Sequence, residues 1–252
     1  MSAINRLMSL RSYNRDWIKY LSYRYRKSDG LITFRLRNGQ KISMHPESRF
    51  TLNETYLDRV YDVPGVDWGS CRHVLDLGAN VGMFALYVAS RNPRATIYCF
   101  EPESRNFDAL RANIKSNKAS ACIYQMAVAA KCGKARLELR GPLNHRLSAA
   151  GDASESVECA DLDAVHRLTG IQQFDFSKID IEGAETEILA SATDLQLRRL
   201  GAISMEWHHS DDKLRDAERR LRQAGFEAKA EVQQGLSYLK ASRQSAISVS
   251  SP

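Results

Sequence analysis

From residue 73 onward, short apolar runs alternate with segments whose apolar residues recur at helical spacing. Segments such as 104–117 place Phe107, Leu110 and Ile114 on one helical face, and residues 73–78 form a short apolar run that ends in Asp and Gly. Strands that alternate with helices predict an α/β fold, a mostly parallel sheet with helices on both faces. The last two β-rich runs, within residues 226–241, predict an antiparallel pair. The other expected strands are 96–102, 121–129, 135–140, 156–162, 176–183 and 201–208. The other expected helices are 83–91, a helix that follows the 176–183 strand and runs through Leu189, and 211–225.

The first 65 residues have a different pattern and predict a small N-terminal extension. Residues 31–44 read as a hairpin, because two β-rich runs flank the turn-forming pair Asn38-Gly39. Before it, apolar residues at near-helical spacing predict one or two amphipathic helices. We therefore expect an extension over 1–65, a main domain over 66–241 and a flexible tail over 242–252.

Charge adds a possible role for the extension. The chain has a net charge of +6, and residues 1–28 contain seven basic residues and one acid, so this segment holds the whole excess. A basic amphipathic helix can pack on its own domain or lie on an anionic membrane surface, and packing is the commoner case. No nucleic-acid-binding module accompanies the charge, so we expect no nucleic-acid partner.

The rest of the composition narrows the class of protein. At 252 residues, with 43% hydrophobic and 26% charged residues, the chain can bury one sizeable core. Its five cysteines are scattered without a CxxC pair, which argues against a disulfide framework and a thiolate zinc site. Without a recognisable secretory signal or a long apolar run, we expect a cytoplasmic protein, with attachment to the membrane periphery as the alternative.

The most informative segment is the turn from Asp76 to Gly82, which follows one expected strand and opens a helix. Gly78 and Gly82 permit a tight turn, and the helix start offers free N–H groups to a ligand. A nicotinamide dinucleotide site would have glycine at the position of Asn80, and a carboxylate such as Asp76 would repel a pyrophosphate. The same carboxylate would attract the ammonium group of S-adenosylmethionine.

Glu101 strengthens the hypothesis of a nucleotide-containing cofactor. It ends the second expected strand, 25 residues after Asp76. An acid at this place in a βαβ unit accepts hydrogen bonds from ribose hydroxyls.

Together these residues carry a family resemblance. The segments Asp76-x-Gly78-x-Asn80-x-Gly82, Phe100-Glu101-Pro102, Lys178-Ile179-Asp180-Ile181-Glu182-Gly183-Ala184-Glu185 and Glu206-Trp207-His208 resemble the FkbM family of S-adenosylmethionine-dependent methyltransferases. The resemblance implies a class I methyltransferase fold, Rossmann-like with a seven-stranded sheet, and O-methylation of a sugar, glycan or natural product. The cofactor-binding residues that we expect on this basis are Asp76, Gly78, Asn80, Gly82, Glu101, Pro102, Ala127 and Asp180.

A hydroxyl is a poor nucleophile, so the fold predicts a base or a metal at the carboxyl ends of the middle strands. Asp180, Glu206 and His208 fall there. In one mechanism, His208 is the general base and a carboxylate orients it. In the other, these three residues bind Mg²⁺ or Mn²⁺, with Glu182 beside them.

Several neighbouring residues have less certain roles. Glu185 could be an ordinary acid of a helix start, and we expect His209 to face away from His208. The polar stretch 141–151 either borders the active site, through Asn144, His145, Arg146 and Ser148, or is a plain loop. An alternative function is a non-catalytic S-adenosylmethionine-binding or scaffolding module that keeps the fold.

Overall fold

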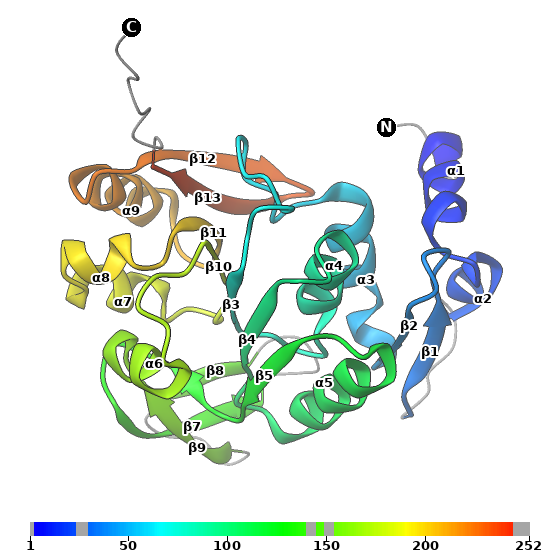
Figure 1. The fold of residues 1–252 in the computed structure, drawn as a ribbon, viewed down its shortest axis with the longest axis horizontal. Helices are drawn as coiled ribbons and strands as arrows, with labels where there is room; N and C mark the ends of the chain where they lie inside the picture. The colour runs from blue at the N-terminus through cyan, green and yellow to red at the C-terminus, as the bar shows by residue number, and fades with distance from the viewer. Residues whose placement is uncertain (1–2, 24–29, 140–144, 149–153, 244–252) are drawn as a thin grey trace, which may run out of the picture.

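The computed structural model describes residues 3–23, 30–139, 145–148 and 154–243. Its main body is a central sheet covered by helices, and the N-terminal elements lie along one side (Figure 1). Within these ranges, no helix combines the length and the hydrophobicity that crossing a bilayer requires.

The central sheet has seven strands in the order β12-β13-β11-β10-β3-β4-β5, which confirms the predicted mostly parallel α/β sheet. The pairs among β11, β10, β3, β4 and β5 are parallel, whereas β13 pairs antiparallel with both β11 and β12. The predicted terminal antiparallel pair is therefore also confirmed. The strands are β3 (His73–Leu77), β4 (Thr96–Phe100), β5 (Ala121–Tyr124), β10 (Phe176–Ile179), β11 (Ala202–Trp207), β12 (Glu227–Gln233) and β13 (Leu236–Ser242).

Helices cover both faces because side chains alternate along each strand. Val74 packs into one core with α4 (Met83–Arg91) and α5 (Ser104–Asn117). Its neighbour Leu75 belongs to the core on the other face, which the remaining helices of the main body cover. These are α6 (Leu162–Thr169), α7 (Glu185–Ser191), α8 (Asp194–Arg198) and α9 (Asp211–Gln223).

A second sheet interrupts the alternation, and the sequence pattern did not predict it. Residues 121–129 are not one strand: β5 ends at Tyr124, and β6 (Ala127–Val128) belongs to a four-stranded sheet of order β6-β9-β7-β8. Its other strands are β7 (Gly133–Leu139), β8 (His145–Ser148) and β9 (Ser154–Ala160). The chain thus leaves the central sheet after β5 and returns through α6, which was also not predicted.

The N-terminal extension contains the predicted helices and hairpin. They are α1 (Ala3–Tyr13), α2 (Trp17–Ser22), β1 (Ile32–Arg35) and β2 (Lys41–Met44), followed by η2 (Pro46–Ser48), α3 (Arg49–Asn53) and the π-helical turn η3 (Glu54–Asp58). Leu10 and Tyr20 are buried in the same core as α4, whereas Met8 and Ile18 are each 66% exposed. Membrane contact through this segment stays a prediction.

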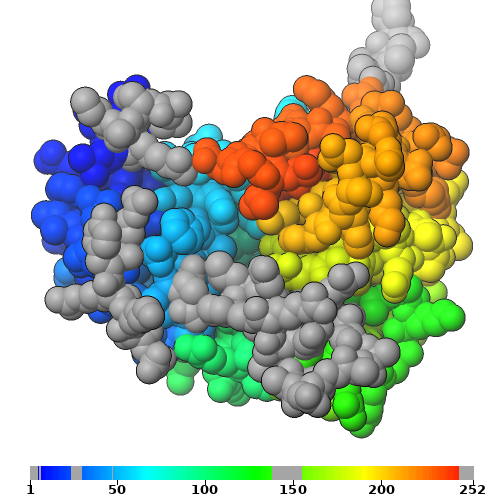
Figure 2. Space-filling model, turned by 180° about the vertical axis from the view of Figure 1, so that it is seen from behind, coloured from blue at the N-terminus to red at the C-terminus, as the bar shows by residue number. Residues whose placement is uncertain are grey.

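The segment after η3 lies where the extension meets the rest of the protein. Figure 2, seen from behind, shows the blue N-terminal elements on one side and the orange C-terminal elements on the other, with light-blue and cyan residues between them. This placement brings Tyr61 to the carboxyl ends of the central strands.

Candidate active site

A pocket opens where β3, β4 and β10 end, at the carboxyl edge of the parallel sheet. The space inside it, including open solvent at its mouth, is about 580 Å³. Six of the predicted cofactor residues line it, namely Gly78, Asn80, Glu101, Pro102, Ala127 and Asp180. The remaining lining residues are Phe100, Asn106, Met126, Val128, Leu137, Ile181 and Glu182. Asp76 and Gly82, also predicted to bind cofactor, are not on its wall.

The two glycines of the turn have packing roles. Gly78 has a φ of +74°, and a Cβ on it would lie 1.7 Å from the carbonyl oxygen of Asp180. Glycine therefore allows the turn after β3 to lie against the chain that leaves β10. Gly82, with a φ of +85°, faces α5 instead, where a Cβ would lie 2.6 Å from Leu110 Cδ1.

Asn80 and Glu101 connect the turns that follow β3 and β4. Asn80 has a φ of +50°, which asparagine tolerates better than most residues, and its Oδ1 accepts a bond from Val81 N. Its own N–H donates to Glu101 Oε2 at 2.7 Å, while Glu103 N donates to Glu101 Oε1 at 3.0 Å. Glu101 is thus locked on the pocket wall. Burial raises the pKa of Glu101 to about 7, even though these backbone bonds oppose the shift.

Asp76 does not face the pocket, because it pairs with Lys178. The two residues are register partners on β3 and β10, with Lys178 Nζ 3.4 Å from Asp76 Oδ1. The same Nζ lies 3.3 Å from Asp180 Oδ2 and donates to the Gly78 carbonyl at 2.6 Å. Asp76 was predicted to attract an ammonium group, and the ammonium it contacts is that of Lys178.

Burial and the neighbouring charges both shift the pKa values of Asp76 and Lys178. Burial raises the pKa of Asp76, against the effect of the lysine. Burial alone would lower the pKa of Lys178, but Asp180 and Asp76 outweigh it and raise that pKa overall. Lys178 was not singled out from the sequence as a site residue, although a charged residue inside the buried strand Phe176–Ile179 was an available signal.

His208, directly after β11, lies among acidic side chains. Its Nδ1 is 2.9 Å from Glu185 Oε1, and its Nε2 is 3.5 Å from both Glu182 Oε2 and Glu206 Oε1. Asp180 Oδ1 lies 3.8 Å from the same Nε2. The structure therefore brings together the three predicted catalytic residues, Asp180, Glu206 and His208.

The surroundings change how His208 behaves as an acid. Burial would lower its pKa, but the hydrogen bonds to Glu185 and Glu206 and the nearby carboxylates raise the pKa of His208 to about 11. The imidazole is then a cation at neutral pH and carries no free site for a further proton. This differs from the general base of ordinary pKa that the sequence suggested.

The carboxylates of the cluster are crowded. Burial, and then the charge of Asp180, raise the pKa of Glu182 to about 7. The same two causes raise the pKa of Glu206. Glu182 and Glu206 are therefore easier to protonate than exposed carboxyls, chiefly because they are buried and secondly because Asp180 repels a second negative charge.

Glu185 and His209 depart from the sequence expectations. Glu185 is fully buried, and its Oε1 accepts bonds from Ile181 N at 3.3 Å and Gly183 N at 3.2 Å, so it is more than an acid of a helix start. The prediction that His209 faces away was wrong, since its Nε2 lies 3.4 Å from Glu185 Oε2. Asn144 and the side chains of His145, Arg146 and Ser148 lie outside the described residues.

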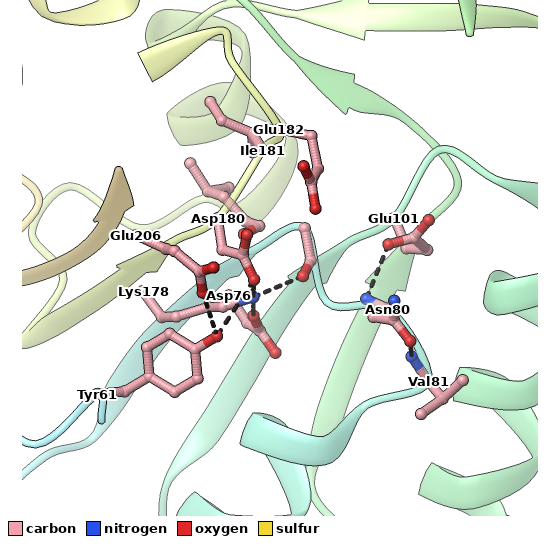
Figure 3. A network of polar contacts seen from close by, with 12 residues as sticks. Tyr61, Asp76, Asn80, Val81, Glu101, Lys178, Asp180, Ile181, Glu182 and Glu206 are labelled. Atoms are coloured by element: carbon pink, nitrogen blue, oxygen red, sulfur yellow. Dashed lines mark hydrogen bonds and ion pairs between the residues drawn. The ribbon is translucent and has the colours of Figure 1, made fainter. Parts of the chain in front are cut away.

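Tyr61, from the N-terminal extension, also reaches the cluster and was missed from the sequence. Its hydroxyl lies 3.2 Å from Asp180 Oδ2 and 3.3 Å from Glu206 Oε2, so its proton can bond to either (Figure 3). Its ring lies 5.4 Å from Lys178 Nζ. Burial, reinforced by the two carboxylates, raises the pKa of Tyr61 well above its usual value, so the hydroxyl stays a donor.

Comparison with known proteins places this site in a family context. Residues 76–228 match the family model described as the methyltransferase FkbM domain. The chain is 30% identical to the 31-O-demethyl-FK506 methyltransferase FkbM of Streptomyces tacrolimicus, over 81% of this chain and 92% of that protein. It is 25% identical to the 2-O-methyltransferase NoeI of Sinorhizobium fredii, over 59% of this chain and 68% of that protein.

Solved structures share the fold. The methyltransferase FkbM from Methylobacillus flagellatus has a TM-score of 0.54 at 11% identity, over 90% of this chain and 59% of that one. Aeropyrum pernix fibrillarin, solved with natively bound S-adenosyl-L-methionine, has a TM-score of 0.51 at 13% identity, over 86% and 84%. These similarities show the class I methyltransferase fold that the sequence predicted.

Proposed function

The chain belongs to the FkbM family of methyltransferases, and we propose that it transfers a methyl group from S-adenosylmethionine to a hydroxyl of a sugar, glycan or natural product. One observation carries the proposal. The pocket at the strand ends and the acidic cluster around His208 share Asp180 and Glu182, so a cofactor site and a reactive site adjoin. The printed names of two relatives, a 31-O-demethyl-FK506 methyltransferase and a 2-O-methyltransferase, support transfer to oxygen.

The lining of the pocket fits the proposed cofactor. One part of the wall is apolar, with Phe100, Met126 and Leu137, which suits an adenine ring. Another part carries Asp180 and Glu182, which suit a cationic sulfonium and ammonium. When bound, S-adenosylmethionine supplies an activated methyl group. The same carboxylates would repel the pyrophosphate of a nicotinamide cofactor.

The chain's own residues then orient the reactants. Glu101, fixed by two backbone N–H groups, keeps further lone pairs to accept bonds from ribose hydroxyls. Lys178 holds Asp180 against the glycine turn, and Tyr61 donates to the same cluster. We propose that Asp180, Glu206 and His208 position the acceptor hydroxyl, and that a carboxylate of this cluster, rather than the protonated His208, takes up its proton.

Methyl transfer can be tested directly on the full chain. Purified protein is incubated with methyl-labelled S-adenosylmethionine and a panel of hydroxyl acceptors, and mass spectrometry records the gain of one labelled methyl group. Calorimetric titrations with S-adenosylmethionine and with NAD run in parallel. Binding of the first with label transfer to oxygen supports the proposal.

The other outcomes separate the alternatives. Binding of S-adenosylmethionine with no transfer to any acceptor favours the non-catalytic binding module. Binding of NAD alone, or transfer only to nitrogen or carbon, overturns the proposed reaction.

A further inference from the structure

We infer that Asn106 recognises the base of the cofactor, because its side-chain amide is placed to donate a hydrogen bond to a ring nitrogen of adenine. Asn106 lies in the first turn of α5 and lines the pocket. It is only 2% exposed, and its Nδ2 has no hydrogen-bond partner among the described residues. The inference rests on the proposed function, since it takes S-adenosylmethionine as the ligand of this pocket.

A second buried asparagine on the same helix shows the contrast with a purely structural amide. Asn113 is 1% exposed, and its Nδ2 donates to the carbonyls of Ser43 at 2.6 Å and of Val81 at 2.8 Å. Its Oδ1 accepts a bond from Ser43 N at 2.8 Å. A buried donor without such a partner costs free energy, so the donor of Asn106 needs an explanation. A ligand in the pocket that Asn106 lines supplies one.

The backbone of Asn106 is held by the N-terminal cap of α5. Its N–H donates to Glu103 Oε2 at 2.6 Å, and Arg105 N donates to Glu103 Oε1 at 3.1 Å. Glu103 N in turn donates to Glu101 Oε1 at 3.0 Å. The carboxylate proposed to hold the ribose and the amide of Asn106 therefore belong to one bonded segment. Such a segment presents an acceptor and a donor with little further ordering when a ligand binds.

The order of the strands puts Asn106 on the adenine side of the pocket. Asp180, which suits the cationic half of the cofactor, follows β10, whereas Glu101 follows β4 and the apolar Met126 follows β5. Because the sheet runs in the order β10-β3-β4-β5, Glu101 lies between the acidic and the apolar parts of the wall. Helix α5 connects β4 to β5, so Asn106 belongs to the apolar part, which suits the adenine ring.

The chemistry of adenine requires a donor at this place. Its ring nitrogens N1, N3 and N7 accept hydrogen bonds, and an ionised carboxylate cannot donate one. Two of the described lining residues, Asn80 and Asn106, have side-chain amides. Asn80 belongs to the turn after β3, on the far side of Glu101 from β5. Asn106 is therefore the lining side chain that is placed to donate to the base.

The test measures binding of S-adenosylhomocysteine to full-length protein by isothermal titration calorimetry. We expect Asn106→Leu and Asn106→Asp, which both lack the amide donor, to weaken binding by about 5–50-fold. Asp108→Ala, on the exposed side of α5, should bind like the wild type. Asn106→Asp keeps the shape of the side chain and carries the test should Asn106→Leu not fold.

Analogues of S-adenosylhomocysteine in which N1, N3 or N7 is replaced by C–H identify the partner of the amide. One of them should bind the wild type more weakly by a similar factor, and this loss should disappear in Asn106→Leu. Analogues that lose the same affinity in the wild type and in the variant overturn the assignment to adenine. A loss seen instead with a 2′-deoxy or 3′-deoxy analogue, and absent in Asn106→Leu, would assign the bond to the ribose and also overturn the inference.

Thermal unfolding without ligand distinguishes recognition from a structural role. Asn106→Leu should leave the melting temperature unchanged or raise it, because its Nδ2 has no described partner to lose. Asn113→Leu, which removes the bonds to Ser43 and Val81, should lower the melting temperature. An equal decrease in both variants would show that Asn106 is structural and would overturn the inference.

The failure of this inference can be told from the failure of the proposed function. Equal binding of S-adenosylhomocysteine by the wild type, Asn106→Leu and Asn106→Asp overturns only the role of Asn106. Binding that depends on Asn106, without methyl transfer to any acceptor, overturns only the proposed reaction. Wild-type protein that binds neither S-adenosylmethionine nor S-adenosylhomocysteine overturns the proposed cofactor and this inference with it.

Discussion

The backbone N–H of Asn80 donates to Glu101 Oε2 at 2.7 Å, which ties the turn after β3 to the end of β4. Asn80 itself adopts a left-handed backbone conformation, with a φ of +50°. The carboxylate of Glu101 thus has a structural role, and the same residue also lines the pocket. Its two roles can be separated experimentally.

We expect Glu101→Ala to weaken S-adenosylmethionine binding by about 1–3 kcal/mol, because the variant lacks a charged hydrogen-bond acceptor. Isothermal titration calorimetry measures the effect, with Asp108→Ala on the exposed side of α5 as the control. An affinity equal to that of the control would contradict the ribose assignment.

Glu101 should also make stability depend on pH. Its pKa of about 7 in the folded protein lies above the ordinary 4.5, so its stabilising contribution is complete below pH 4.5 and is lost as the pH rises through 7. The full effect is at most about 3 kcal/mol. The free energy of unfolding, measured with urea from pH 5 to 8, should decline less steeply with pH for Glu101→Gln than for the wild type or Glu158→Gln. Parallel curves would show that this carboxyl does not titrate as expected.

His208→Ala should leave cofactor affinity nearly unchanged and reduce turnover by about 10²–10⁴-fold. The reason is that His208 contacts the acidic cluster, while Glu101 and the glycine turn line the cofactor pocket. Steady-state kinetics and calorimetry separate the two effects. His73→Gln, at the opposite end of β3, is the control, and normal turnover by His208→Ala would remove this residue from the mechanism.

Tyr61→Phe should lower the unfolding free energy by about 1–2 kcal/mol and also reduce turnover, since Asp180 and Glu206 lose a shared donor. Tyr87→Phe is a matched control, because it removes a tyrosine hydroxyl that donates to Asp62 at 2.7 Å. Chemical unfolding should show comparable decreases in unfolding free energy for the two variants, whereas turnover should stay normal only for Tyr87→Phe. Equal turnover would mean that the Tyr61 hydroxyl is purely structural.

Gly78→Ala should destabilise the fold far more than Gly170→Ala. Both glycines have similar positive φ angles, +74° and +72°, so alanine costs about 1–2 kcal/mol at each from backbone strain alone. A Cβ on Gly170 meets nothing within 4 Å, whereas one on Gly78 collides with the Asp180 carbonyl. Thermal unfolding measures the decrease in melting temperature for each of the two variants. Equal decreases would show that the backbone at Asp180 shifts without cost to accommodate the new Cβ.

The local pattern predicted most of the central sheet and the separate N-terminal hairpin, because βα alternation and the turn at Asn38-Gly39 are encoded within short segments. It failed at 121–129, where Gln125 and Met126 separate two strands of different sheets. β6 pairs with β9, about thirty residues further along, and a local pattern does not say which distant strand a segment joins.

For the candidate site, too, local patterns were predictive and contacts between distant segments were not. Asp180, Glu206 and His208 were predicted to meet because parallel strands end at one edge of a sheet. Tyr61 lies 119 residues before Asp180, on a segment without strand periodicity, so no spacing rule connects the two. The ion pair between Asp76 and Lys178 was not predicted, because a local pattern does not reveal which residues become register partners on neighbouring strands.

The position of Tyr61 bears on where the N-terminal boundary of a shortened, functional protein can be placed. The match to the family model begins at residue 76, so a protein shortened to that boundary would lack Tyr61. It would leave Phe84 and Tyr238 without the aromatic ring of Tyr61 that packs on both, and Asp180 and Glu206 would lose a hydroxyl that can donate to either. A fusion protein that includes this methyltransferase should therefore begin upstream of η3, so that it retains the N-terminal extension together with the methyltransferase domain.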